Sequence, residues 1–169
     1  MDEPVTKQAA RAAYGSGRAQ DWQEALRLLE AAMIAGEPGA SRQLALVTQL
    51  PLEEMLAPPA PERLTPRPRV AAARGFAPPG FADWLIDHAR DRLEAARVND
   101  ARGDAVRTAR SFAFGPQDRD LVLAILQERA GRLLGAPVAC HEPPNAISYE
   151  PGQEYRQHAD FIEPSIPQF

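Results

Sequence analysis

Apolar residues recur every three or four positions through the first third of the chain, which is the spacing of a helix with one buried face. The longest such run comprises Ala25, Leu28, Leu29, Ala32 and Met33. Asp21 and Glu24 have the spacing of a capping box at its start, and Gly36 suits its end. The pattern predicts a helical segment over residues 1–57 with three helices: one before Gly15, one from Asp21 to Gly36, and one from Ala40 to about Pro51.

Proline interrupts this helical pattern. Five of the 17 prolines fall close together, at Pro58, Pro59, Pro61, Pro66 and Pro68. Because proline has no backbone N–H and clashes with the preceding helical turn, such a stretch suits neither a helix nor a central strand. We expect residues 58–69 to be a stiff, extended linker, followed by a second domain over residues 70–169.

The second domain is expected to begin with a strand and a helix. The sequence predicts a strand over Val70–Phe76, a turn at Pro78-Pro79-Gly80, and a helix over Phe81–Ala96. One apolar stripe runs along that helix: Phe81, Leu85, Ala89, Leu93 and Ala96. His88 lies beside the stripe, so we expect it at the surface or half-buried.

One more helix and several short extended runs follow. Arg107–Phe114 has an extended pattern, and Pro116 with Asp118 has the character of a helix start. The inward face of that helix would be Val122, Leu126, Ala130 and Leu133. Three extended runs are then predicted, the last two forming a hairpin around Pro151-Gly152: Val138–His141, Ala146–Tyr149 and Tyr155–Asp160. This order of elements predicts an α+β fold.

Composition narrows the class of protein. A hydrophobic content of 44% with 25% charged residues is ordinary for a globular protein, and no apolar run approaches the length of a membrane helix. A formal net charge of -4 favours neither nucleic acid nor an anionic membrane surface as partner. The first residues lack the apolar core of a secretory signal. Cys140 is the single cysteine, which excludes an internal disulfide framework and fits a cytoplasmic protein.

The candidate chemistry lies near the end of the chain. On a strand, residues two apart point to the same side, so the imidazole of His158 and the carboxylate of Asp160 can reach one metal ion. Alone, this pair is a weak signal. With 23 acidic residues among 169, one such pair among three histidines is close to what chance gives, and a surface histidine beside an aspartate is the alternative interpretation.

The residues around this pair are more specific. The run from Ile147 to Asp160 combines Tyr149, an acid with Pro-Gly-Gln, Tyr155 three residues before His158, and the His-Ala-Asp triplet. This run resembles the iron-binding motif of the prolyl 4-hydroxylase family of iron(II)- and 2-oxoglutarate-dependent dioxygenases. Further similarity covers Arg69–Phe76, Trp84–Ile86, Arg92-Leu93, Val106–Ser111 and Pro137–Tyr149, so that the resemblance extends from Arg69 to the end.

The resemblance implies a fold and a set of site residues. The fold would be the N-terminal part of a double-stranded β-helix, or jelly roll, with buttressing helices. His158 and Asp160 match two iron ligands. Tyr149 and Tyr155 match tyrosines that line the pocket of co-substrate and metal, with Tyr155 as the catalytic candidate; packing of a strand pair is an equal alternative for Tyr149. Arg107, Thr108 and Ser111 match a segment near the substrate groove, whereas Cys140 and His141 match no functional position.

The resemblance also implies a reaction. The complete protein would use iron(II), 2-oxoglutarate and ascorbate to hydroxylate a peptidyl proline or similar residue in a protein or peptide substrate. A second histidine and a lysine or arginine, which the family places several tens of residues further on, are absent from the nine residues after Asp160. We therefore expect a sequence truncated within the catalytic domain, or a shortened relative completed by a partner, and no turnover by this chain alone.

A different function remains open for the first 57 residues. The stretch from Ala12 to Leu46 is similar to a Sel1-like helical repeat, with matches at Tyr14-Gly15, Gly17, Asp21, Ala25, Leu28, Ala31-Ala32, Gly36 and Ala40. It covers about one repeat, so a plain helical hairpin is an equal possibility. The alternative function is a helical protein-interaction module attached to a degenerate oxygenase remnant. An exposed half-sheet would in either case favour self-association.

Overall fold

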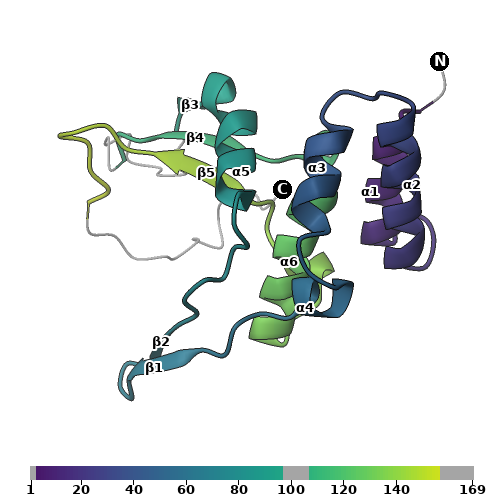
Figure 1. Ribbon diagram of the computed structural model, residues 1–169. Coiled ribbons are helices and arrows are strands. Elements are labelled where there is room, and N and C mark those ends of the chain that lie inside the picture. Colours follow the sequence, from purple (N-terminus) through teal and green to yellow (C-terminus); the bar gives the residue numbers. More distant parts are fainter. Residues whose placement is uncertain (1–2, 97–106, 157–169) are drawn as a thin grey trace.

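The computed structural model describes residues 3–96 and 107–156 (Figure 1). These residues form helices and small antiparallel sheets, so the predicted α+β class is confirmed. His158 and Asp160 lie outside the described residues. Within the described ranges, no helix combines the length and apolarity that a bilayer-crossing segment needs.

The helical pattern of the first 57 residues is confirmed. Three of the four helices there were predicted, and the fourth was not: α1 (Val5–Tyr14), α2 (Trp22–Ile34), α3 (Ala40–Val47) and α4 (Leu52–Leu56). The Asp21 carboxylate caps α2 by accepting a hydrogen bond from the Glu24 backbone N–H at 2.9 Å. Pro51 stands immediately before α4, because proline at a helix start sacrifices no hydrogen bond.

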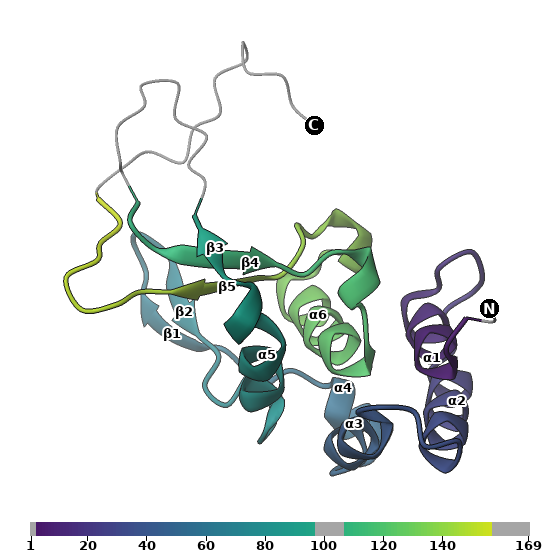
Figure 2. The same cartoon turned by 90° about the horizontal axis from the view of Figure 1, so that it is seen from above.

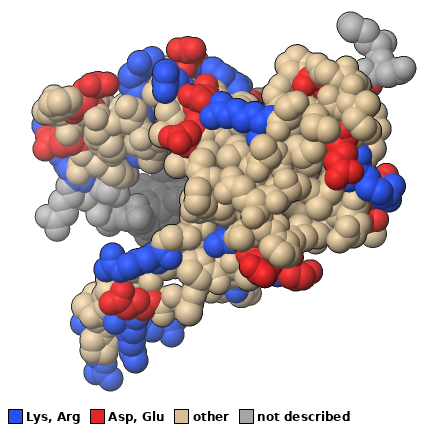
Figure 3. Space-filling model, viewed as in Figure 1, with Lys and Arg blue, Asp and Glu red and all other residues tan. Residues whose placement is uncertain are grey.

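The proline-rich stretch is a hairpin arm, and the prediction of a plain extended linker is wrong. β1 (Glu62–Thr65) pairs antiparallel with β2 (Val70–Ala72), which ends four residues before the predicted Phe76. A two-stranded ladder has only edge strands, so prolines in its turn and flanks remove no ladder bond. Arginines gather on this arm (Figure 3), where the exposed ones are Arg63, Arg67, Arg69 and Arg74.

The helix after the arm is shorter than predicted. α5 (Phe81–Ala89) ends in a short 3-10 turn, η1 (Arg90–Arg92), and Glu94–Ala95 is strand β3. The predicted helix to Ala96 is therefore wrong in its last turns. β3 pairs with β4 (Arg110–Ala113), a contact across the sequence that helical spacing alone does not reveal.

The last helix also begins later than predicted. Pro116–Asp118 forms a 3-10 turn, η2, and α6 (Leu121–Leu134) starts after Asp120, which caps it by accepting from the Leu123 backbone N–H at 2.8 Å. All five residues from Leu121 to Ile125 are buried, so the first turns of α6 are buried on all sides and not only on the predicted face that contains Val122. Val138–Cys140 is a 3-10 turn, η3, rather than the predicted extended run.

One hydrophobic cluster joins the two halves of the chain. Residues from the first four helices and from α5 and α6 share it, with Leu29, Met55, Phe81, Leu121 and Ile125 among its fully buried members. Figure 2 shows α3 and α4 lying beside α6 rather than apart from it. The hairpin arm therefore does not separate two hydrophobic cores.

A three-stranded sheet lies beside these helices. Its order is β3-β4-β5, with β5 at Asn145–Ser148, and its pairings are antiparallel. One face packs against α5 through Phe112 and Ala146, which lie against buried Ala89 (Figure 2). Ile147 alternates with Ala146 on β5 and is 45% exposed, so no described helix covers the other face at that point.

Candidate functional site

The residues predicted to bind substrate and co-substrate gather along β4. Arg107 forms an isolated antiparallel bridge with Tyr155. Ser111 sits in the middle of the sheet, paired with Glu94 on β3 and with Ile147 on β5. Tyr149 follows the last residue of β5. The structure thus brings Arg107, Thr108 and Tyr155 together just before β4, and Ser111 lies within that strand.

The course of the chain between Tyr149 and Tyr155 differs from the predicted hairpin. Ser148 pairs with Arg110, and Tyr155 pairs with Arg107. The chain advances seven residues on one side and three on the other, so four residues bulge outward. In the described part of the chain, both flanks of the bulge pair with the β4 side rather than with each other, and the predicted hairpin of 146–149 with 155–160 is wrong there.

The bulge contains an ordered turn at the predicted Pro-Gly position. The Gln153 backbone N–H donates to the Glu150 carbonyl at 2.9 Å, and the Glu150 backbone N–H donates to Gln153 Oε1 at 2.8 Å. Gly152 takes a φ of 88°, a left-handed conformation that glycine adopts without steric cost. The Gln153 side chain therefore closes the turn, which gives it a structural role in this motif.

Thr108 fastens the far end of the bulge. Its backbone N–H donates to the Glu154 carbonyl at 3.2 Å. Its hydroxyl oxygen accepts from the Glu154 backbone N–H at 2.9 Å and lies 3.3 Å from the Glu154 carbonyl. Thr108 thus supports the bulge through its backbone and its hydroxyl group, and its predicted role near the substrate stays a prediction.

Arg107 and Tyr155 form a cation–aromatic pair beside the bulge. The Arg107 guanidinium carbon lies 4.7 Å from the centre of the Tyr155 ring. The Nε atom of Arg107 is buried and has no hydrogen-bond partner among the described residues. A buried donor without a partner is costly, so this N–H group distinguishes Arg107 from the arginines of the described ranges that form ion pairs.

The aromatic side chains at this edge face solvent. Tyr149 is 44% exposed and Tyr155 is 41% exposed. Large apolar groups exposed together are typical of surfaces that another group covers. Among the described residues there is no cluster of three or more His, Cys, Asp or Glu side chains that could hold a metal ion. His88 is exposed on α5, with its Nδ1 2.8 Å from the Trp84 carbonyl oxygen, as expected for a surface histidine.

Replacing Thr108 with valine is expected to loosen the bulge without unfolding the chain. The variant keeps the shape of the side chain but leaves the Glu154 backbone N–H without its acceptor, at a cost of about 1 kcal/mol. Amide hydrogen exchange at Glu154 and Gln153 should quicken several-fold. Exchange in α2 should be unchanged, and equal protection of Glu154 in both proteins would contradict the role assigned to Thr108.

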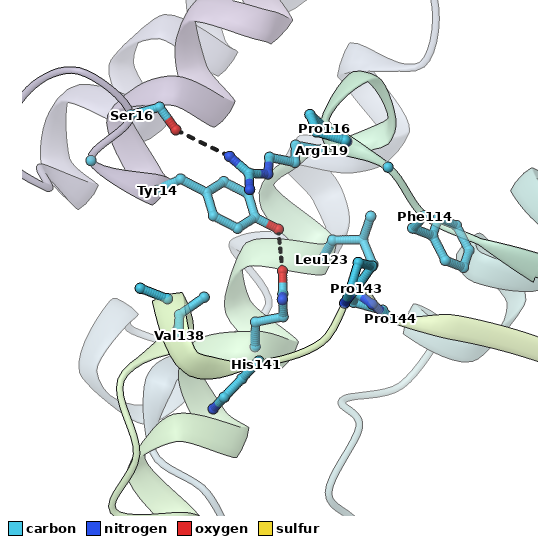
Figure 4. Close-up of a pocket in the computed structure, with 14 residues that line it drawn as sticks. Tyr14, Ser16, Phe114, Pro116, Arg119, Leu123, Val138, His141, Pro143 and Pro144 are labelled. Atoms are coloured by element: carbon cyan, nitrogen blue, oxygen red, sulfur yellow. Dashed lines mark hydrogen bonds between the residues drawn. The ribbon is translucent and has the colours of Figure 1, made fainter. Parts of the chain in front are cut away.

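The sequence does not predict a contact between the end of α1 and α6. Tyr14 at the end of α1 reaches Gln127 on α6, and its hydroxyl donates to Gln127 Oε1 at 2.7 Å (Figure 4). Burial, with the nearby Asp120 carboxylate, raises the pKa of Tyr14. In the sequence, Tyr14-Gly15 matches a helical repeat and gives no indication of a contact with α6. The 113 positions between Tyr14 and Gln127 explain why no local pattern revealed the contact.

Comparisons with known proteins find no family model, no curated protein and no solved structure that matches this chain.

Proposed function

We propose that the chain carries the metal motif of an iron(II)- and 2-oxoglutarate-dependent dioxygenase that hydroxylates a peptidyl proline or a similar residue. The observation that supports it best is the contact between Arg107, whose buried Nε has no partner among the described residues, and Tyr155, which stands three residues before the predicted ligand His158. The β3-β4-β5 sheet would be the beginning of a double-stranded β-helix.

The described residues have a definite part in this proposal. Tyr149 and Tyr155 each expose aromatic surface and carry a hydroxyl group beside the sheet, which suits a small polar co-substrate. The free Nε–H of Arg107 suits a carboxylate, because arginine binds carboxylates through directed N–H groups. Bound iron(II) would supply the activation of dioxygen that hydroxylation of a C–H bond requires. His158 and Asp160 would hold the metal.

The alternative function, an independent helical interaction module, receives less support. Helices α1 to α4 share one hydrophobic cluster with α5 and α6. Met55, Leu56 and Val47 would lose buried contacts if these helices acted apart from the rest. The shared cluster favours a role for the first 57 residues in supporting the sheet, and it is compatible with the proposed oxygenase.

Metal binding by the chain tests the proposal. In an anaerobic titration, we expect iron(II) followed by 2-oxoglutarate to produce the visible absorption of an iron–oxo-acid chelate. His158→Ala and Asp160→Ala should each weaken iron binding by about tenfold or more, because each removes one ligand. Arg107→Gln should weaken the response to 2-oxoglutarate while leaving iron binding intact.

An exposed histidine elsewhere provides the matched control. His88 lies on α5 in contact with Trp84, and His88→Ala should bind iron as well as the wild type. Equal iron binding by His158→Ala and His88→Ala would contradict the proposed ligand. Succinate release in the presence of iron(II), ascorbate, dioxygen and a proline-containing peptide would be measured separately, and no turnover is expected from this chain alone.

A further inference from the structure

A cavity of about 370 Å³ lies between the end of α1, the turn that precedes α6, and the 138–144 segment (Figure 4). Its apolar wall comes from residues distant in the sequence: Tyr14, Phe114, Leu123, Pro143 and Pro144. Ligand-binding pockets typically span roughly 300–1,000 Å³, so this cavity has room for a small organic molecule. It is built from elements other than the strand edge that carries Arg107 and Tyr155.

Arg119 stands at the mouth of this cavity. Its guanidinium lies 4.7 Å from the centre of the Tyr14 ring, and its NH1 atom donates to Ser16 Oγ at 3.3 Å (Figure 4). Arg119, Ser16 and Pro116 also line a second hollow, which Lys7 and Arg11 enter from α1. The two hollows therefore meet at Arg119, one mostly apolar and the other bearing three cations.

Among the residues that the structure describes, two of these three cations have no carboxylate partner. Arg11 pairs with Glu3 at 3.2 Å. Lys7 donates only to backbone carbonyls, those of Gln117 at 2.6 Å and Arg119 at 3.2 Å. Asp120 follows Arg119 in sequence but directs its carboxylate to Trp84 and to its own helix.

Arg119 also has no carboxylate partner among the described residues. Among the described residues, Arg119 and Lys7 make no salt bridge, while many other arginines of the chain do. Arg119 is exposed, its planar guanidinium is held over the Tyr14 ring, and the residue lines both hollows. A site with free cationic donors beside an apolar wall is complementary to an anion that carries an apolar body.

We propose that this cavity binds a small carboxylic acid with a flat apolar body. The carboxylate would contact Arg119, on the side of the second hollow that Lys7 lines, and the apolar body would lie against Tyr14, Phe114 and Pro144. Gln127, whose Oε1 accepts from the Tyr14 hydroxyl, fixes the ring that forms the cavity wall. This site is separate from the proposed dioxygenase site and does not depend on iron.

Binding of hydrocinnamate to the full chain tests this assignment. The probe is an aromatic ring on a short carboxylic acid, and its uncharged amide is the matched control ligand. In an NMR titration, hydrocinnamate should bind about tenfold more tightly than the amide, with shifts centred on Tyr14, Arg119 and Gln127. Equal affinity for acid and amide, or shifts centred elsewhere, would overturn the proposal.

Variants of exposed arginines separate the site from general charge effects. Arg119→Gln should abolish the preference for the acid, and Arg119→Lys should restore part of it. Arg132→Gln removes a charge from an exposed arginine on α6 that pairs with Glu128, and it should leave binding unchanged. Loss of binding in Arg132→Gln to the same extent as in Arg119→Gln would contradict a specific site. The dispersion of the amide spectrum reports folding of each variant.

Discussion

Replacing Asp120 with alanine is expected to lower the free energy of unfolding by about 2–4 kcal/mol, because one carboxylate holds two buried donors. Asp120 Oδ1 accepts from the Leu123 backbone N–H at 2.8 Å and so caps α6. Its Oδ2 accepts from the Trp84 indole at 2.7 Å and so joins α5 to α6. The side chain is 8% exposed, and solvent cannot replace either bond.

Two further variants separate the contributions of the two bonds. Asp120→Asn keeps an acceptor for the helix cap but places an amide donor near the Trp84 indole, so it should lose only the second bond. Asp21→Ala removes an equivalent cap from α2, where the bond to Glu24 is 2.9 Å and no tryptophan is involved. Urea denaturation should therefore rank the loss as Asp120→Ala first, with Asp21→Ala near 1 kcal/mol. Equal losses for these two variants would refute the Trp84 contribution.

The cost of Asp120→Ala should also depend on pH. Burial raises the pKa of Asp120 in the folded chain, against the opposing hydrogen bonds from Leu123 and Trp84. The folded state therefore binds the proton more tightly than the unfolded state does. The resulting stabilisation is complete below the unfolded pKa and is lost as pH rises through the folded pKa. The difference in unfolding free energy between wild type and Asp120→Ala should thus shrink from acid to neutral pH, and growth over that range would contradict the raised pKa.

The same aspartate shows where local sequence signals fail. Asp118 and Asp120 are both acceptable N-caps, and the sequence prediction placed the helix start at Pro116–Asp118. In the structure Asp118 closes a 3-10 turn by accepting from the Gly115 backbone N–H at 2.8 Å, and Asp120 caps the helix. The choice depends on Trp84, which is 36 positions away and supplies the second donor to Asp120.

The strand pairings, like the start of α6, are decided by contacts between residues far apart in the sequence. The turn around Pro151-Gly152 was predicted from its residues and is present, since Gln153 donates to Glu150. Its flanks were predicted to pair with each other, but they pair with Arg110 and Arg107 instead. The residues that form a turn lie within four positions of one another, so the turn could be predicted from the sequence. The choice of partner strand depends on contacts across about forty positions, so the pairing could not.

The site residues are predicted from a resemblance to a motif, and the structure shows which of the described ones lie together. Arg107 and Tyr155 were assigned separately and prove to be direct neighbours. Thr108, predicted near the substrate, holds the bulge through its hydrogen bonds to Glu154. Arg119 carried no motif, because its partners Ser16 and Tyr14 lie more than a hundred residues earlier. A side chain whose contacts are with residues far away in the sequence cannot be recognised from the pattern of the residues next to it.

Replacing Arg129 with methionine is expected to cost about 3–5 kcal/mol, because a buried guanidinium satisfies carbonyls from two other elements. Arg129 lies on α6 and is 6% exposed. Its Nε donates to the Phe76 carbonyl at 2.9 Å, which ties down the end of the hairpin arm. Its NH1 donates to the Met55 carbonyl at 2.7 Å in the last turn of α4, where a cation also complements the helix dipole.

The variants of Arg129 have a matched control one helical turn away. Arg132 is exposed on α6 and pairs with Glu128, so Arg132→Met should change the unfolding free energy by no more than about 0.5 kcal/mol. Arg129→Lys keeps the charge but lacks the planar fork that reaches Phe76 and Met55 at once, so it should recover less than half of the loss. Urea denaturation measures the cost, and hydrogen exchange in β1 and β2 reports release of the arm. If Arg129→Met and Arg132→Met were equally stable, the carbonyl contacts would contribute nothing, and α4 and the arm would be held by apolar packing alone.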